Sequence, residues 1–481
     1  MLYHSTRNAD LTANSAQAVL EGLAADGGLY VPCTLPEFDW VGCLQGNSLQ
    51  MQTQILSALL PDIPDMPRLV QRAYAGKFET PELTPTVSVG DFSVLELFRG
   101  PTSAFKDIAL SMLPQLLTAA RTACGVEKPI RILTATSGDT GKAALVGFQD
   151  VPGVEICVFY PHGGVSQVQR AQMVTQEGAN VAVCAVEGNF DDAQTGVKQI
   201  FTACRDKELP FRLSSANSIN IGRLAPQIMY YFRSYKQLLE AGRIRLGDKV
   251  NYAVPTGNFG DILAGWFAKR LGLPVGRLIC ASNANRVLTD FIRTGTYDRR
   301  RPLLKTESPS MDILVSSNLE RLLYLLCKDA GKVAQMMEAL RRDGVYTVPD
   351  ELLAAIQAEF DAGYCDDARA REVIGRVYAK RHYLCDPHTA AGWAAAEDYV
   401  ARTGDTTAMV VLSTASPFKF PEAVLTAIGA DTSGSGFDQM ERLSKVTGVP
   451  IPAPLAALRG KPERHTRVIA REAMTDYVLS L

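Results

Sequence analysis

A lysine at the start of a predicted helix is the first candidate for chemistry in this sequence. Lys106 lies in LELFRGPTSAFKDIALSMLPQLL, where a loop gives way to an amphipathic helix. The apolar neighbour Phe105 would partly desolvate the amine, and desolvation disfavours the ammonium form. An amine with a lowered pKa can condense with an aldehyde to form a Schiff base. The alternative from spacing alone is an exposed lysine paired with Asp107, since most lysines are solvated.

A glycine-rich turn predicts a second site, one for a phosphate group. In KVNYAVPTGNFGDILAGWFAKRLG we expect a strand to end, a turn with Gly257 and Gly260 to follow, and a helix to begin. Glycines let the backbone approach an anion closely, and free amides at a helix start stabilise its charge. The turn lacks the Lys-Ser/Thr ending of a nucleotide P-loop and the GxGxxG spacing of a dinucleotide site. The pattern therefore fits another phosphate ligand, or a tight structural turn without a ligand.

The elements that must position these residues are predicted from the apolar pattern, which indicates an α/β fold. Up to about Tyr74 the pattern is mainly helical, and further along short runs rich in Val and Ile alternate with helices. The runs that we predict as strands are IRILTAT, EICVFY, NVAVCAV, KVNYAV, GRLICAS and AMVVLST. Such runs favour mostly parallel open sheets, with helices such as DILAGWFAKRLGL and PEAVLTAIGA as crossovers.

This reading divides the chain into three segments. Residues 1–80 form a mainly helical N-terminal segment, residues 81–235 an α/β domain that carries Lys106, and residues 236–481 an α/β domain that carries the glycine turn. Ligands of open parallel sheets bind outside the carboxyl ends of the strands. The residues that follow each strand are therefore the strongest candidates for function.

The composition argues against several classes of protein. The chain has 481 residues, of which 47% are hydrophobic. It contains 49 Lys and Arg and 51 Asp and Glu, so its net charge creates no positive electrostatic potential that would favour nucleic acid or an anionic membrane. Its ten cysteines form no CxxC pair and no short-spaced cluster with the five histidines, which predicts neither a metal site nor a disulfide framework. We see no secretion signal and no run of roughly 20 apolar residues, so a cytoplasmic protein is expected.

Several motifs, taken in their order, resemble the threonine synthase family. ELFRGPTSAFKD is followed by TSGDTG at 136–141, NSIN at 217–220 and GNFGD at 257–261. Further matches are DGGLYVP near the N-terminus, PSMDI at 309–313, DPHTA at 386–390 and LSTASPFKF near the C-terminus, so the resemblance covers nearly the whole chain. It implies a fold-type-II pyridoxal-phosphate enzyme with the tryptophan synthase β-like fold. Such enzymes convert O-phospho-L-homoserine and water into L-threonine and phosphate by γ-elimination and β-addition of water.

The resemblance also implies which residues bind the cofactor, pyridoxal 5'-phosphate. Lys106 would hold it as a Schiff base and would then move protons among the α, β and γ carbons of the substrate. Thr414, after the strand AMVVLS, would meet the pyridine nitrogen, and a hydroxyl partner leaves that nitrogen largely unprotonated. A threonine that merely ends a strand is the alternative. The residues implied around the cofactor phosphate are Gly257, Asn258, Phe259 and Gly260.

Substrate contacts are predicted at a second helix start. TSGDTG follows the strand IRILTA, so its amides and the hydroxyls of Ser137 and Thr140 are candidates for the substrate carboxylate. Ordinary N-capping by Ser137 or Asp139 is the alternative. Asn217 is a candidate for a substrate or cofactor contact, with capping of the following helix as its alternative. The candidates for the substrate phosphate are Arg99, Arg223 and Lys419, although solvated or paired basic residues are the commoner case.

One position departs from the family pattern. Members commonly carry His where this chain has Arg99, and arginine does not titrate near neutrality. An acid–base role at this position would therefore be lost, whereas a phosphate contact would be kept or strengthened. His162 and His388 are expected to be hydrogen-bonded structural residues, because neither has a second metal ligand at a suitable spacing.

Three alternative functions remain open. One is another fold-type-II enzyme, such as a serine/threonine dehydratase or a cysteine synthase. Another is a phospho-lyase that acts on phosphohydroxythreonine-like compounds. The third is a non-catalytic homologue that binds the cofactor or a partner, although the retention of Lys106 and both turns counts against it. In each case we expect a small-molecule ligand, no nucleic-acid or membrane partner, no metal, and a monomer or homodimer.

Overall fold

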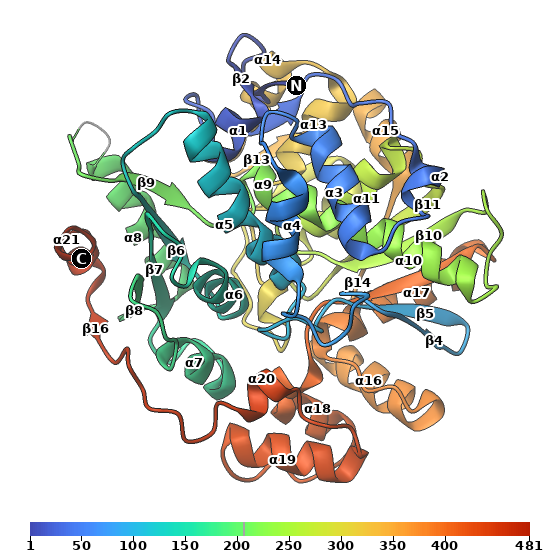
Figure 1. Cartoon of the computed structure of the whole chain (residues 1–481). Coiled ribbons are helices and arrows are strands. Elements are labelled where there is room, and N and C mark those ends of the chain that lie inside the picture. The colour runs from blue at the N-terminus through green and yellow to red at the C-terminus, as the bar shows by residue number, and fades with distance from the viewer. Residues whose placement is uncertain (205–206) are drawn as a thin grey trace.

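Two largely parallel sheets organise the protein, which is described here as a computed structural model covering residues 1–204 and 207–481 (Figure 1). The five-stranded sheet has the order β16-β8-β7-β6-β9, and all its neighbours are parallel. The six-stranded sheet has the order β14-β11-β10-β15-β5-β4 and is parallel except for the β4–β5 pair. The predicted α/β fold with mostly parallel open sheets is confirmed.

The strands of the five-stranded sheet are β6 (Ile130–Ala135), β7 (Val154–Pro161), β8 (Val181–Val186), β9 (Arg212–Ser215) and β16 (Val468–Ile469). Those of the six-stranded sheet are β4 (Thr86–Val89), β5 (Phe92–Glu96), β10 (Val250–Pro255), β11 (Val275–Ser282), β14 (Phe360–Tyr364) and β15 (Ala408–Ser413). All six predicted strands are present, because runs rich in Val and Ile suit strands that are buried on both faces.

The helices that follow these strands and flank the sheets are α5 (Lys106–Ala123), α6 (Asp139–Phe148), α7 (Gln167–Val174), α8 (Phe190–Ala203), α9 (Ile221–Leu224), α10 (Ile228–Glu240), α11 (Gly260–Arg270), α12 (Val287–Thr294), α13 (Leu319–Cys327), α14 (Ala330–Arg342), α15 (Asp350–Glu359), α16 (Asp367–Arg381) and α17 (Pro387–Thr403). Shorter elements are the 3₁₀ turns η1 (Ala225–Gln227), η2 (Pro309–Met311), η3 (Pro417–Lys419) and η4 (Arg471–Ala473), and the hairpin of β12 (Thr296–Asp298) with β13 (Val345–Thr347). The chain ends with α18 (Pro421–Ala427), α19 (Gly436–Thr447), α20 (Ala453–Ala456) and α21 (Met474–Ser480).

The N-terminal segment is mainly helical, as predicted, but it also contains a small sheet. Its helices are α1 (Ser15–Glu21), α2 (Trp40–Cys43), α3 (Ser48–Leu59) and α4 (Met66–Tyr74). Its antiparallel strands are β1 (Leu2–Ser5), β2 (Thr12–Asn14) and β3 (Tyr30–Pro32). We did not predict these strands, because three or four residues are too few to show a clear alternation of apolar and polar positions.

The sheets do not follow the predicted boundaries at residues 81 and 236. Strands β4 and β5, from the second predicted segment, complete the sheet of the third, and β16 near the C-terminus pairs with β8 of the second. Figure 1 shows the last part of the chain returning from α19 to α21 beside the five-stranded sheet. Helix α18 is likewise present, but it follows the last strand of its sheet and is not a crossover. Pairing of strands that are distant in the chain leaves no local signal.

Helices α5 and α6 pack closely against each other. Pro114 lies inside α5 and has no amide, so it removes the donor that the carbonyl of Leu110 would meet in a regular helix. Gly147 of α6 lies against this carbonyl, and a Cβ at Gly147 would be 2.0 Å from the Leu110 oxygen. The helices can therefore approach closely, with Lys106 at the start of one and Asp139 at the start of the other.

The cysteines are free thiols, and seven of the ten are buried. Across residues 1–204 and 207–481, no group of three or more His, Cys, Asp or Glu side chains is arranged to hold a metal ion. Within the same ranges no helix combines the length and the apolar character that crossing a membrane requires.

Candidate active site

A single large cavity of about 1480 Å³ collects most of the predicted site residues. Loops at the carboxyl ends of β6, β9, β10 and β15 line it, as does the start of α5. The predicted residues on its wall are Lys106, Ser137, Thr140, Asn217, Gly257, Asn258, Phe259, Gly260 and Thr414. Of the predicted site residues, Arg99 and Lys419 do not line the cavity. The rule that open sheets bind ligands at the carboxyl ends of their strands thus describes this protein well.

The amine of Lys106 is buried at the cavity wall. The residue is 8% exposed, and its Nζ lies 3.2 Å from Oγ of Ser310 and 3.7 Å from Oδ2 of Asp139. Burial lowers the pKa of Lys106 to about 8, although the charge of Asp139 opposes this shift. The alternative of an exposed lysine paired with Asp107 is wrong, because the Asp107 carboxylate accepts hydrogen bonds from the amide and hydroxyl of Thr102.

Thr414 lies beside Lys106 because two loops are tied together by their backbones. The amide of Phe105 donates to the carbonyl of Thr414 at 2.8 Å, and the amide of Ser416 donates to the carbonyl of Ser103 at 3.1 Å. Thr414 directly follows β15 and is 4% exposed. Its hydroxyl makes no hydrogen bond within the described ranges, so it is free to meet a ligand in the cavity.

The start of α11 has the character of a phosphate site. The amides of residues 257–260 donate to no acceptor within 1–204 and 207–481, and no side chain caps the helix. Phe259 has a left-handed backbone (φ 62°), which is strained for a bulky residue. The carbonyls of Gly257 and Asn258 accept from Oγ of Ser316 at 2.8 Å and Nδ2 of Asn318 at 3.1 Å. Four neighbouring free amides form a concave donor set that fits a phosphate group.

Glycine is required at the first position of this turn. A Cβ at Gly257 would be 2.6 Å from the backbone oxygen of Ser310, whereas a Cβ at Gly260 would meet nothing closer than 3.5 Å. The 309–318 segment therefore presses against the turn and holds it in place. The reason for glycine here is a close approach of backbone to backbone.

The start of α6 is similar, but part of it is already occupied by the protein. Oγ1 of Thr136 accepts from the amides of Gly138 and Gly141, each at 2.9 Å. The predicted alternative, N-capping by Ser137 or Asp139, is therefore wrong, because the side chain that accepts from these amides is Thr136. Residues 137, 139 and 140 have amides without an acceptor among the residues that the structure covers, and these remain available to a ligand.

Asn217 and Arg223 bring polar groups to another part of the wall. The predicted alternative for Asn217 is wrong, because α9 is capped by Asn220, whose side chain accepts from the amide of Gly222 at 2.8 Å. Arg223 is 3% exposed, it donates to the carbonyl of Ala216, and its Nε has no partner in the described part of the chain. No carboxylate within residues 1–204 and 207–481 forms an ion pair with it, and burial lowers the pKa of Arg223 to about 10. A buried cation without a counter-ion on a cavity wall favours an anionic ligand.

The other two basic candidates are engaged elsewhere. Arg99 lies outside the cavity, where it pairs with Glu96 at 2.6 Å and with Glu79 at 3.0 Å. Lys419 is fully buried behind the wall, and its Nζ lies 2.5 Å from Oδ1 of Asp139. This geometry does not support a phosphate contact for either residue, and both contacts stay predictions.

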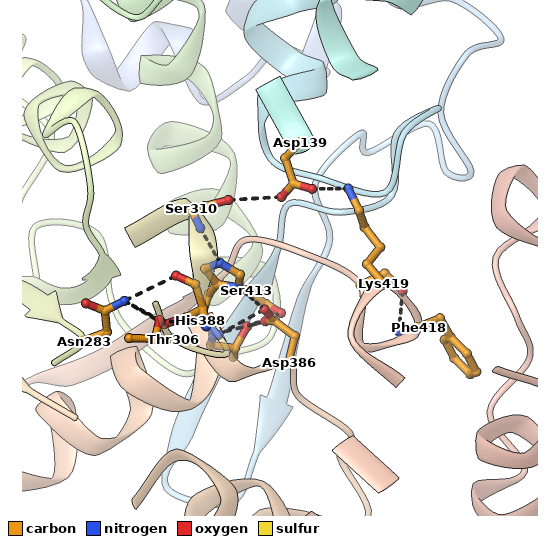
Figure 2. Close-up of polar contacts among 12 residues, drawn as sticks. Asp139, Asn283, Thr306, Ser310, Asp386, His388, Ser413, Phe418 and Lys419 are labelled. Carbon is orange, nitrogen blue, oxygen red and sulfur yellow. Dashed lines mark hydrogen bonds and ion pairs between the residues drawn. The ribbon is translucent and has the colours of Figure 1, made fainter. Parts of the chain in front are cut away.

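A polar network links the cavity wall to α17, and the sequence did not reveal it (Figure 2). Oγ of Ser310 donates to Oδ2 of Asp139 at 3.2 Å, and its amide donates to Nε2 of His388 at 3.2 Å. Because Nε2 accepts, the proton of the neutral ring is on Nδ1, which lies 2.6 Å from Oδ2 of Asp386. The motifs PSMDI and DPHTA were the available signal, but neither shows which residues meet.

The two histidines differ from each other. The prediction of a hydrogen-bonded structural residue is confirmed for His388, which is 2% exposed and bonded through both ring nitrogens. For His162 it is wrong, because this side chain is exposed and its ring makes no hydrogen bond within the described ranges. A loop position after a strand does not distinguish these two outcomes.

Three family models match the chain and together span most of it. The model described as pyridoxal-phosphate dependent enzyme matches residues 79–414. The models described as threonine synthase N terminus and threonine synthase, C-terminal match residues 2–74 and 389–478.

Known relatives agree with these matches. The threonine synthase of Pseudomonas aeruginosa is 41% identical, with 88% of this chain and 90% of that protein covered, and that of Saccharomyces cerevisiae is 37% identical, with 89% of both covered. The threonine synthase-like 1 protein of Macaca fascicularis is 39% identical over 86% of this chain, and this chain spans 58% of its length.

Solved structures give the same result. The pyridoxal-phosphate-bound threonine synthase from Brucella melitensis is 36% identical, with a TM-score of 0.88 over 100% of this chain and 99% of that one. The yeast threonine synthase structure is 34% identical, with a TM-score of 0.88 over 99% of this chain and 98% of that one. On these matches, the chain belongs to the threonine synthase family of pyridoxal-phosphate-dependent enzymes.

Proposed function

We propose that this chain is a threonine synthase that converts O-phospho-L-homoserine and water into L-threonine and phosphate. The observation that carries the proposal is that a buried amine, Lys106, and a turn of four free amides at residues 257–260 line one cavity. The buried, unpaired Arg223 on the same wall supports a second anionic group there. The relatives named threonine synthase, which match this chain over most of both proteins, support the same reaction.

The same geometry supports a set of cofactor-binding residues. The amides of Gly257, Asn258, Phe259 and Gly260 would bind the cofactor phosphate, and the hydroxyl of Thr414 would meet the pyridine nitrogen. The amine of Lys106 would hold the cofactor covalently. When bound, pyridoxal phosphate supplies an electron sink that stabilises negative charge on substrate carbons.

The substrate carries two anionic groups, and the cavity offers a separate place for each. The free amides at the start of α6, with the hydroxyls of Ser137 and Thr140, would bind the carboxylate. Arg223 would bind the phosphate with the help of Asn217, whose side chain is free of helix capping. We keep Arg99 out of this set, since its guanidinium is paired with two glutamates outside the cavity.

Lys106 is also the group suited to move protons. Its pKa of about 8 leaves part of the population as the free base near neutrality, so Nζ can both accept and return a proton. We expect it to take the proton from the α carbon and then one from the β carbon as the γ-phosphate leaves. It would then return a proton to the γ carbon. Water then adds at the β carbon.

The test is incubation of the protein with O-phosphohomoserine and pyridoxal phosphate, followed by measurement of threonine and phosphate. Equal amounts of both products are expected, and Lys106→Ala should yield neither. Phosphate accompanied by a keto acid would contradict the proposal and would indicate a different lyase. No product of either kind from wild-type protein reconstituted with cofactor would contradict an enzymatic function.

Lys142 provides a matched control for this test. It is buried in α6, burial lowers the pKa of Lys142 to about 8, and its Nζ donates to Gln176 at 2.6 Å. It shares the electrostatic character of Lys106 but does not line the cavity. Lys142→Ala should therefore still form the covalent cofactor adduct on Lys106, whereas an adduct on Lys142 in the wild-type protein would contradict the assignment.

A further inference from the structure

Three buried charged side chains from three separate elements meet at the cavity wall and directly behind it. Lys106 begins α5, Asp139 begins α6, and Lys419 ends η3. The exposed fractions of their side chains are 9%, 2% and 0%. Figure 2 shows Lys419 and Ser310 approaching the Asp139 carboxylate from different elements. Neither the Asp139 carboxylate nor the Lys419 amine has a place in the proposed reaction.

The Asp139 carboxylate is shared unequally between the two lysines. Its Oδ1 lies 2.5 Å from Nζ of Lys419 and accepts from Nε2 of Gln169 at 2.9 Å. Its Oδ2 accepts from Ser310 at 3.2 Å and lies 3.7 Å from Nζ of Lys106. Lys419 therefore has the short contact and Lys106 has the long one. The carboxylate cannot turn fully towards Lys106 without giving up these other bonds.

This sharing affects the reactivity of Lys106. A buried amine with a carboxylate to itself would be held as the ammonium ion, because an opposite charge favours the charged form. An ammonium ion is neither a nucleophile nor a base. With a second cation in direct contact, the negative charge of Asp139 is largely compensated before Lys106 takes a proton.

We propose that Lys419 is a positioning residue for Lys106, which keeps the Lys106 amine available as a nucleophile and base by neutralising Asp139. The inference rests on the proposed function, since it takes Lys106 as the reacting amine.

The other charges near Lys106 agree with this direction. Burial is the largest cause that lowers the pKa of Lys106, Asp139 raises it, Lys419 and Arg223 lower it, and Asp107 raises it. Asp261 of α11 also interacts with Lys106, and His388 faces the same cavity. Removal of Lys419 leaves Asp139 uncompensated, so the pKa of Lys106 should rise. Removal of the Asp139 charge should lower it.

A purely structural role is the competing explanation. Lys419 also donates to the carbonyl of Thr102 at 3.2 Å, so it joins η3 to the loop before α5. A residue that only joins these segments would affect the free energy of unfolding. It would leave the protonation of Lys106 unchanged in any variant that folds.

The experiment measures that protonation directly and does not depend on turnover. The chain of 481 residues, freed of cofactor, is mixed with pyridoxal phosphate from about pH 6 to about pH 10, a range that spans the lowered lysine pKa. The free amine attacks the aldehyde carbon and one water leaves. Borohydride then reduces the product to a stable secondary amine, and peptide mass spectrometry gives the initial rate of modification at Lys106. The rate should rise with pH, with a midpoint near the pKa of about 8.

The variants give opposite expected shifts. Lys419→Met and Lys419→Gln should move the midpoint upward by about one pH unit, and Asp139→Asn should move it downward. Lys419→Arg, which keeps the charge, should restore the wild-type midpoint. Lys419→Gln retains a donor for Asp139, so it tests the idea even if Lys419→Met does not fold, and circular dichroism verifies each fold.

The possible failures are distinguishable. An unchanged midpoint in a folded Lys419→Gln or Lys419→Met variant would overturn this inference and leave the proposed function intact. A downward shift in either variant would also overturn it. If the wild-type protein forms no adduct at Lys106, the proposed function itself fails.

Discussion

Two helix starts in this protein share a strand–loop–helix geometry but differ in what they leave free. Before α11, four consecutive amides have no acceptor in the described ranges, and the loop carbonyls are bound by Ser316 and Asn318. Before α6, the Thr136 hydroxyl takes two of the amides, and the Asp139 carboxylate stands in the first turn. The start of α11 therefore offers all four amides to an anion. At the start of α6, two amides already donate to a side chain of the protein.

The difference shows how one backbone motif can be suited to two ligands. Four free donors at a helix start suit a phosphate with several oxygens. The start of α6 keeps fewer free donors and carries the Asp139 carboxylate, so we assign to it the weaker anion, the proposed substrate carboxylate. Glycine and a helix start are thus not sufficient to identify a phosphate site, because the side chains of the loop decide how many amides remain.

The largest expected effect that tests this comparison is on the open turn. Gly257→Ala places a methyl group 2.6 Å from the Ser310 backbone oxygen, which cannot rotate away. The turn must shift, at a cost of about 3 kcal/mol, and the dissociation constant of pyridoxal phosphate should rise roughly 150-fold. Fluorescence titration measures it. Gly260→Ala, where the added Cβ meets nothing closer than 3.5 Å, is the control, and equal losses in both variants would refute this account.

The next largest effect is expected from a charge on the cavity wall. The loops before α6 and α11 contain no basic residue, so Arg223 supplies a positive charge that neither loop has. Arg223→Met removes the buried cation of the cavity wall, which should weaken substrate binding by about 2 kcal/mol and raise KM roughly 30-fold. Cofactor affinity, which we assign to the turn before α11, should change much less. Steady-state kinetics with O-phosphohomoserine gives KM. Arg99→Met serves as the comparison, and a larger increase for Arg99→Met than for Arg223→Met would restore Arg99 as the substrate ligand.

A smaller effect is expected at the partly satisfied helix start. Thr136→Val keeps the shape of the side chain but removes the acceptor for the amides of Gly138 and Gly141. The free energy of unfolding should fall by about 1 kcal/mol, with cofactor affinity unchanged. Urea denaturation provides the measurement. Thr134→Val, in strand β6 just before Thr136, removes a buried hydroxyl that has no partner in the described chain, so it should not destabilise. An equal loss there would contradict the capping role of Thr136.

The smallest effect concerns a hydrogen bond that holds the turn at residues 257–260 in place. Ser316→Ala removes the hydroxyl that donates to the carbonyl of Gly257 at 2.8 Å. One such bond contributes about 1 kcal/mol, so cofactor affinity should fall roughly fivefold. The same titration applies. If KM for the substrate rose while cofactor affinity stayed constant, the support of this turn would belong to the substrate site.

Much of the fold and part of the site were predictable from local properties of the chain. The six Val- and Ile-rich strands, the turn at residues 257–260 and the position of Lys106 at a helix start each depend on a few consecutive residues. Their order, together with the motifs, was enough to indicate the family. Such features survive in any context, because a buried strand must be apolar and a closely packed turn must contain glycine.

The remaining features depend on contacts between distant parts of the chain. Glu96 is close to Arg99 in the sequence, but nothing there indicates that Glu79 also pairs with Arg99 outside the cavity. Nothing near Arg223 indicates that it is buried without a counter-ion among the described residues. The sharing of Asp139 by Lys106 and Lys419 likewise arises only when α5, α6 and η3 pack together. Residue types and local order are properties of neighbouring residues, whereas burial and charge compensation are properties of distances in space, and the packing of the two sheets sets those distances.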